Sequence, residues 1–238
     1  MHSQSKSDLG RRLFLQKAGT AAAGMIATGA VLPTATPGAE EKEQGQEDVS
    51  TNEDLMREHG ILKRVLLAYE EIISRVSLGQ EFPPQTVTDA AEIIRKFIED
   101  YHEKLEENHL FPRFRQRKRL VDLVDVLYAQ HQAGRRLTDG ILANAKLLKA
   151  QEDRDKLSAT LRAFVRMYAP HEAREDTVLF PELHKIVSPH EYDALGEQFE
   201  KIERQTFGGD GFDIYRDKIA AIERQLGIYD LAQFTPKG

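Results

Sequence analysis

The chain has 238 residues, with 39 acidic and 33 basic side chains and a formal net charge of −6 at neutral pH. It contains no cysteine, which excludes disulfides, iron–sulfur clusters and thiolate zinc sites. This length predicts one domain of good size with appendages, and the absence of a basic stripe predicts no binding to nucleic acid.

The first feature along the chain lies in residues 1–39. Arg11 and Arg12 precede a mildly apolar stretch at 18–32, and small residues and prolines follow it. This order resembles a twin-arginine export signal, so we expect recognition by the twin-arginine export machinery and a periplasmic location, outside the cytoplasmic membrane. The apolar stretch is shorter than the roughly 20 residues that a spanning helix needs. No clean cleavage motif follows it, so membrane anchoring through an uncleaved signal stays an alternative.

Residues 40–50 are acidic and polar without periodicity, which predicts a linker. Apolar residues then recur with a helical period, and this pattern predicts four long helices at about 50–78, 86–109, 118–149 and 153–178. Pro112 and Pro181 are expected to end the second and fourth helices, because proline lacks the backbone N–H that a helix interior uses. The sequence therefore predicts an all-α class, with a bundle over residues 51–187.

A C-terminal helical extension is predicted over residues 188–238. Ser188 and Pro189 form a helix start, and that helix is expected to reach about Gln205. Glycines at 208–211 break the chain, and a last short helix is predicted at 213–226.

The most informative pattern is a set of histidines and glutamates that occurs twice. Each half contributes one lone histidine and one His-x-x-x-Glu pair: His59 with His102 and Glu106, then His131 with His171 and Glu175. The lone histidines are 72 residues apart (131 − 59), and the pairs are 69 apart (171 − 102). Leu-Phe-Pro follows each pair at the same offset, at 110–112 and 179–181. Together these features indicate an internal repeat built around polar side chains.

The spacing has a direct physical meaning. Residues four apart lie on the same face of a helix, so each pair can point an imidazole and a carboxylate at one centre. Each of the four histidines also lies on the apolar stripe of its helix. One such histidine would be read as a hydrogen-bonded core residue, but four of them with two carboxylates would bury too much unpaired polarity. The set therefore predicts ligands for two iron-like metal ions.

The pattern resembles the hemerythrin-like, or HHE cation-binding, family over about residues 50–187. The resemblance is carried by Arg57-Glu58-His59, His102 to Pro112, Gln130-His131 and His171 to Pro181. It implies an antiparallel four-helix bundle that holds a non-heme di-iron centre, with two iron ions bridged by oxo or hydroxo. By the same resemblance the four histidines are terminal ligands and the two glutamates bridge the irons. A ferritin-like centre is disfavoured, because the Glu-x-x-His spacing it needs occurs at Glu99 but not at Tyr168.

The chain also departs from the oxygen-carrying hemerythrins. Arg135 stands where those proteins have a fifth histidine, so the chain looks more like a subfamily with four histidines and two glutamates. Their second carboxylate lies five residues after its histidine, a place taken here by Asp176, which stays an alternative ligand. Glu103 and Glu172 directly follow paired histidines and are further candidates.

The leading functional prediction is that the iron pair binds a small ligand, dioxygen, nitric oxide or peroxide, as a carrier or sensor. A di-iron redox enzyme, oxidase- or peroxidase-like, is the alternative, and metal storage is a third class. The sequence identifies neither a redox partner nor an oligomeric state. The basic run at 113–119 falls at a connection between helices, which favours a solvated loop over a nucleic-acid surface.

Overall fold

The computed structural model describes residues 49–236, which form helices and no strand. The predicted export signal at 1–39 and nearly all of the linker lie outside the described residues. No helix in the described range is long and apolar enough to cross a membrane. The predicted all-α class is confirmed for this part of the chain.

The first two long helices bring the first half of the repeat into the core. Helix α1 spans Thr51–Ser77, and the side chain of Ser50 caps it by accepting the Glu53 N–H. The second run is continuous through five segments: α2 (Gln85–Ile93), η1 (Ile94–His102), α3 (Glu103–Leu105), η2 (Glu106–Leu110) and α4 (Phe111–Gln116). Segments η1 and η2 are π-helical. This geometry is rare in proteins as a whole, but where it occurs it is often at a functional site.

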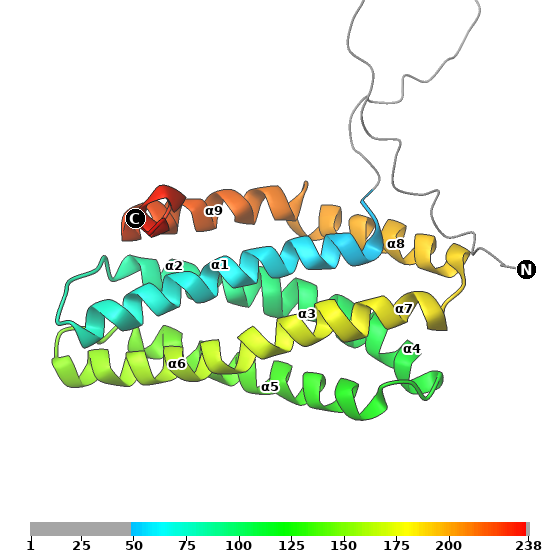
Figure 1. Cartoon of the computed structure of the whole chain (residues 1–238), viewed down its shortest axis with the longest axis horizontal. Coiled ribbons are helices and arrows are strands. Elements are labelled where there is room, and N and C mark those ends of the chain that lie inside the picture. The colour runs from blue at the N-terminus through cyan, green and yellow to red at the C-terminus, as the bar shows by residue number, and fades with distance from the viewer. Residues whose placement is uncertain (1–48, 237–238) are drawn as a thin grey trace, which may run out of the picture. The chain divides into compact units, whose positions relative to one another are not determined.

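The next two long helices carry the second half. Helix α5 spans Val121–Asn144, and a fourth run follows as α6 (Gln151–Arg174), the π-helical η3 (Glu175–Leu179) and α7 (Phe180–Ile186). Helix α5 begins three residues later than predicted, because Lys118 and Leu120 have positive φ angles of 53° and 49° that turn the chain. These four runs lie lengthwise beside one another in Figure 1, with α1 against α6 and α5 against α6 and α2.

The predicted ends of the second and fourth helices are wrong. Both runs continue past their prolines, to Gln116 and Ile186, instead of ending near Pro112 and Pro181. In each case a π turn comes first, in which the N–H of Phe111 or Phe180 donates to the carbonyl five residues earlier. The proline then stands at the start of a new α segment, where its missing N–H costs the helix least.

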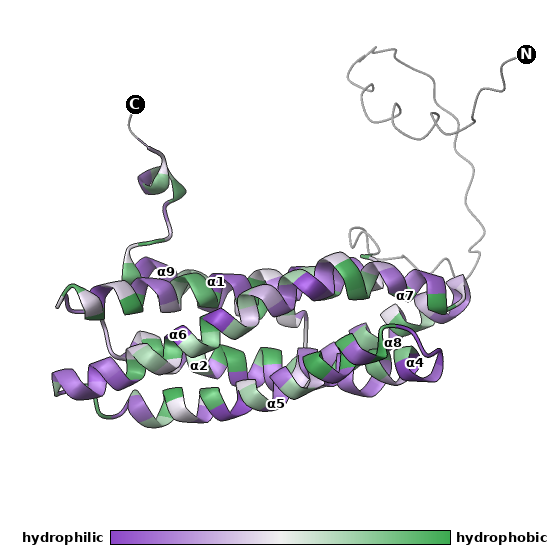
Figure 2. Cartoon of the chain, turned by 60° about the horizontal axis from the view of Figure 1, so that its bottom comes forward, coloured by the Kyte–Doolittle hydropathy of each residue, from purple (hydrophilic) through white to green (hydrophobic). Residues whose placement is uncertain are grey.

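The C-terminal segment packs beside the first two helices. Helix α8 (Pro189–Phe207) contacts α1, and helix α9 (Gly211–Leu226) contacts both α1 and α2, before a short 3₁₀ turn, η4 (Leu231–Phe234). The side chains of Ser188 and Asp210 cap α8 and α9. Figure 2 shows that the helices carry hydrophobic residues along part of their surface and hydrophilic residues along the rest, as packing around a common core requires.

Candidate metal centre

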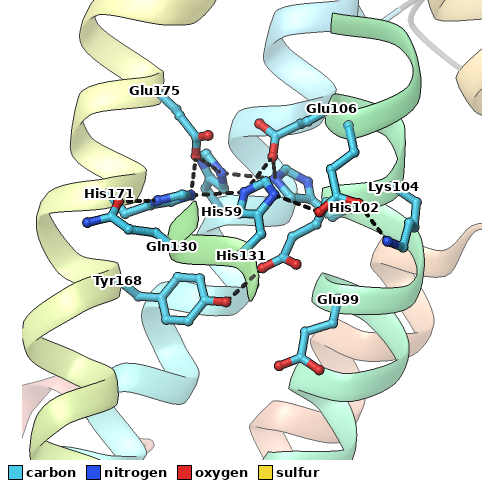
Figure 3. Close-up of polar contacts among 12 residues, drawn as sticks. His59, Glu99, His102, Lys104, Glu106, Gln130, His131, Tyr168, His171 and Glu175 are labelled. Atoms are coloured by element: carbon cyan, nitrogen blue, oxygen red, sulfur yellow. Dashed lines mark hydrogen bonds and ion pairs between the residues drawn. The ribbon is translucent and has the colours of Figure 1, made fainter. Parts of the chain in front are cut away.

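The structure brings all six predicted ligand residues to one place in the core. Each of the four long runs contributes, and Figure 3 shows the side chains pointing toward one another. All six are buried, with at most 4% of each residue exposed: His59, His102, Glu106, His131, His171 and Glu175. Residues from distant parts of the chain therefore converge as the repeat predicted.

These six residues form two sets of three donor groups, each able to hold one cation. His59, His102 and Glu106 make one set, and His131, His171 and Glu175 make the other. Within the sets, the Nε2 atoms of His59 and His102 are 3.0 Å apart, and those of His131 and His171 are 3.2 Å apart. All four Nε2 atoms thus face the centre.

The two glutamates lie between the sets. Oε2 of Glu175 is 3.0 Å from Nε2 of His171 in its own set and 3.4 Å from Nε2 of His59 in the other. Oε2 of Glu106 is 3.7 Å from Nε2 of His102 and 3.4 Å from Nε2 of His131. Each carboxylate therefore reaches an imidazole of both sets, which is the placement a bridging ligand needs.

The donor set fits two metal cations on its own chemistry. Both oxygens of Glu106 and of Glu175 are buried without a hydrogen-bond partner, and such groups are costly unless a cation offsets them. Burial raises the pKa of Glu106 well above its usual range. Burial opposes ionisation of Glu175 too, but His171 and His59 hold its pKa well below the usual range. Protein groups alone thus favour ionisation of Glu175 but not of Glu106, whereas two cations would stabilise the ionised form of both carboxyls.

The outer nitrogen of each imidazole, Nδ1, also has a partner. The pairs are His59 with Asp176 (2.7 Å), His102 with Glu58 (2.6 Å), His131 with Glu107 (3.2 Å) and His171 with Gln130 (2.9 Å). A donor hydrogen on Nδ1 leaves the lone pair of Nε2 free for a metal, and the partner fixes the ring orientation. The site therefore has an organised outer layer as well as a ligand layer.

This outer layer follows the same repeat as the ligands. Glu58 and Gln130 directly precede the lone histidines, and each contacts the paired histidine of its own half. Glu107 and Asp176 directly follow the paired glutamates, and each contacts the lone histidine of the other half. No role was predicted from the sequence for Glu58, Glu107 or Gln130, although their places beside ligands recur in register.

The alternative ligands point elsewhere in the structure. Asp176 contacts the outer nitrogen of His59, so its carboxylate does not face the centre. Glu103 accepts hydrogen bonds from Tyr168 and Arg135, and Glu172 pairs with Lys63.

Arg135 takes no place at the centre either. Its guanidinium pairs with Glu103 at 2.6 Å and with Glu107 at 2.8 Å. Burial opposes ionisation of Glu107, but its contacts with His131, Lys104 and Arg135 outweigh that effect and lower its pKa to about 2. The residue at the fifth-histidine place thus organises carboxylates around the ligands.

Comparison with known proteins agrees with this geometry. Residues 50–153 match the hemerythrin HHE cation binding domain. This segment is therefore similar to an HHE cation-binding domain. The match includes His59, His102, Glu106 and His131 but stops before the second His-x-x-x-Glu pair, which the fold brings to the same centre.

Full-length relatives occur in mycobacteria. An uncharacterized protein of Mycobacterium tuberculosis is 46% identical over 234 residues, covering 96% of this chain and 91% of the relative, and one of Mycobacterium bovis matches to the same extent. The chain belongs to the same family as these proteins. No solved structure matches it significantly.

The structure of this candidate metal centre also explains the Leu-Phe-Pro repeat. Glu106 and Glu175 each open a π turn. The turn ends at a phenylalanine whose ring stacks on a lone histidine: Phe111 on His131 and Phe180 on His59, both with centroids 5.4 Å apart. Each π turn thus places a carboxylate at the centre and stacks a phenylalanine ring on an imidazole.

Replacing Glu58 by alanine is expected to weaken metal binding to the candidate centre by about 10- to 100-fold, because His102 loses the partner that orients it. Competition with a chromophoric chelator measures this affinity. Glu172→Ala is the matched control, since Glu172 is also buried beside a ligand but pairs with Lys63. Equal affinities of the two variants would show that the contact to His102 does not tune the site.

Proposed function

We propose that this HHE domain is an antiparallel four-helix bundle that holds a non-heme pair of iron ions. His59, His102, His131 and His171 would be the terminal ligands, and Glu106 and Glu175 would bridge the ions. One observation carries the proposal: each buried carboxylate reaches imidazoles of both sets, and its oxygens have no protein hydrogen bond.

The donor chemistry supports iron. Imidazole with carboxylate suits iron, whereas magnesium and calcium prefer oxygen alone, and the chain has no thiolate. Three further carboxylates contact ligand imidazoles: Glu58, Glu107 and Asp176. Together with Glu106 and Glu175 they would surround two cations with five carboxylates, an arrangement that suits ions of high charge.

We propose that the physiological ligand is small: dioxygen, nitric oxide or peroxide, bound as in a carrier or sensor. The ligand residues are almost fully buried. Three grooves along the described helices, one beside α2 and α9 and two beside α1, have none of these six residues in their lining. This enclosure favours a molecule of two atoms or little more over an organic substrate. Iron would supply the binding and redox chemistry.

A redox enzyme is the second candidate, and one observation favours it. The buried Tyr168 lies beside His171 and donates its hydroxyl hydrogen to Glu103. A phenol in this place offers an electron and a proton near the centre. Optical spectra of anaerobically purified protein, before and after addition of oxygen, separate the candidates. A stable adduct supports a carrier, irreversible oxidation supports a sensor or enzyme, and sustained consumption of peroxide supports the enzyme.

The purified protein is expected to contain about two iron atoms per chain. His102→Ala and His171→Ala should each remove most of this iron, because each variant deletes a ligand from one set. Elemental analysis and the visible spectrum measure the loss. His190→Ala, at an exposed histidine, is the control and should keep the metal. Full iron content with an unchanged spectrum in both core variants would refute the ligand assignment.

We also propose export by the twin-arginine route, with Arg11 and Arg12 as the recognised pair. Changing both to lysine is expected to leave the protein in the cytoplasm, where it should still bind iron, since no proposed ligand precedes Ser50. Cell fractionation followed by metal analysis tests both statements. Normal export of the double variant would remove this assignment.

A further inference from the structure

We propose that Tyr168 is a redox-active residue: it supplies one electron to the iron pair when peroxide is the oxidant, and its phenolic proton passes to Glu103. This inference rests on the proposed di-iron function.

Tyr168 has the position that this role requires. It is fully buried on α6, one turn before His171, and its ring meets that imidazole edge-on with centroids 5.5 Å apart. Its hydroxyl donates to Oε1 of Glu103 at 2.7 Å, and Figure 3 marks this contact of Tyr168 with a dashed line. The phenol therefore contacts a proposed iron ligand on one side and a proton acceptor on the other.

The acceptor is held in place. Glu103 is buried, and its second oxygen receives a hydrogen bond from Arg135 at 2.6 Å. Arg135 is only partly buried and also contacts Glu107. This guanidinium fixes the carboxylate so that Oε1 stays directed at Tyr168, and it links the acceptor to groups nearer the surface.

Packing alone does not explain the hydroxyl. A Cβ added at Gly134 on α5 would lie 1.9 Å from the Tyr168 hydroxyl oxygen, so a glycine in the helix interior makes room for that atom. Glycine weakens a helix interior, and a phenylalanine at 168 would bury the same ring without a polar group. The matching place in the first half of the repeat is Glu99, so metal ligation does not require a tyrosine there.

A second buried tyrosine provides a contrast. Tyr168 contacts Phe164 at 4.4 Å between ring centroids, and Phe164 meets Tyr69 edge-on at 5.5 Å. The hydroxyl of Tyr69 has no hydrogen-bond partner among the described residues. Without an acceptor, Tyr69 cannot release its proton when it loses an electron, which makes it the matched control.

The reaction balances when the iron pair starts with one ferrous and one ferric ion. Reduction of hydrogen peroxide to two waters breaks the O–O bond and consumes two electrons and two protons. Ferrous iron held by the six ligand residues would supply one of these electrons. Tyr168 gives the other electron and becomes a neutral tyrosyl radical, its proton leaves through Glu103, and solvent supplies the second proton.

The test uses the full chain, loaded with iron, reduced by one electron, mixed with hydrogen peroxide and frozen for electron paramagnetic resonance. We expect a radical whose signal narrows with ring-deuterated tyrosine, in the native protein and in Tyr69→Phe. In Tyr168→Phe the radical should be lost, while the iron content stays that of the native protein. Glu103→Gln keeps the ring and an acceptor for the hydrogen bond but takes no proton, so we expect at least a tenfold lower radical yield.

Two results would overturn the proposal: an unchanged radical yield in Tyr168→Phe, or no radical in native protein that holds two irons. Should Tyr168→Phe fail to bind iron, an unchanged yield in Glu103→Gln overturns it instead. A native chain that binds no iron pair would refute the proposed di-iron function itself, and metal analysis of the same sample distinguishes that failure.

Discussion

Removing the metal from the folded protein is expected to lower its thermal midpoint by roughly 8–16 °C. A ligand at about 1,000 times its dissociation constant adds about 4 kcal/mol to the stability of the folded state. In a domain of this size each kcal/mol shifts the midpoint by about 2–4 °C. The metal is therefore expected to be a main source of stability.

The geometry explains why the effect should be large. Four imidazoles and two carboxylates face one another in the core, and the four carboxylate oxygens have no protein hydrogen bond. Without cations, the close carboxylates of Glu106 and Glu175 leave buried charge or polarity uncompensated, which costs several kcal/mol per uncompensated ion. The unfolded chain exposes the same groups to water and avoids that cost.

The measurement compares melting curves of iron-loaded protein, chelator-treated protein and chelator-treated protein given iron again. The third sample should recover the midpoint of the first. His102→Ala provides the control, because a variant that holds little iron should lose little stability when the chelator is added. Equal midpoints for loaded and stripped native protein would place the metal at an exposed, incidental position instead.

The sequence predicted the six core residues because two independent regularities coincide there. The spacing of four places each His and Glu pair on one helical face, and the apolar stripe tells which face turns inward. The partners of Nδ1 could not be predicted in this way. Glu58 and Gln130 are each adjacent in sequence to a ligand, so they lie about 100° around the helix from it. Their contacts depend on the register of a neighbouring helix, which periodicity does not provide.

The helix ends show a second limit of the sequence. Pro112 and Pro181 read as stops, because proline removes a donor from the ordinary helix pattern. The structure uses a different pattern at these points: the N–H of Phe111 and that of Phe180 each reach five residues back. The Leu-Phe-Pro repeat was visible in the sequence, but its cause is a π turn that begins at a proposed bridging ligand and seats an aromatic ring on a histidine.

Gly134→Ala is expected to lower the free energy of unfolding by about 1–3 kcal/mol, the usual cost of overpacking a filled core. Helix propensity alone would predict the opposite, a more stable protein, since alanine in a helix interior is favoured over glycine by about 1 kcal/mol. The new methyl would meet the Tyr168 hydroxyl oxygen at 1.9 Å and the ring carbon Cζ at 2.7 Å. Tyr168 is a rigid, fully buried ring and cannot yield without losing its contact with Glu103.

Gly140→Ala on the same helix is the matched control. Its Cβ would lie 3.5 Å from the nearest atom, Cγ2 of Thr160, which is an ordinary contact. That variant should gain about 0.5–1 kcal/mol from helix propensity alone. Urea denaturation of both variants gives the difference, and adding Tyr168→Phe to Gly134→Ala should recover part of the loss because the nearest clashing atom is removed. If Gly134→Ala is as stable as Gly140→Ala, the Tyr168 hydroxyl does not pack against α5. The position from which it donates to Glu103 would then be wrong.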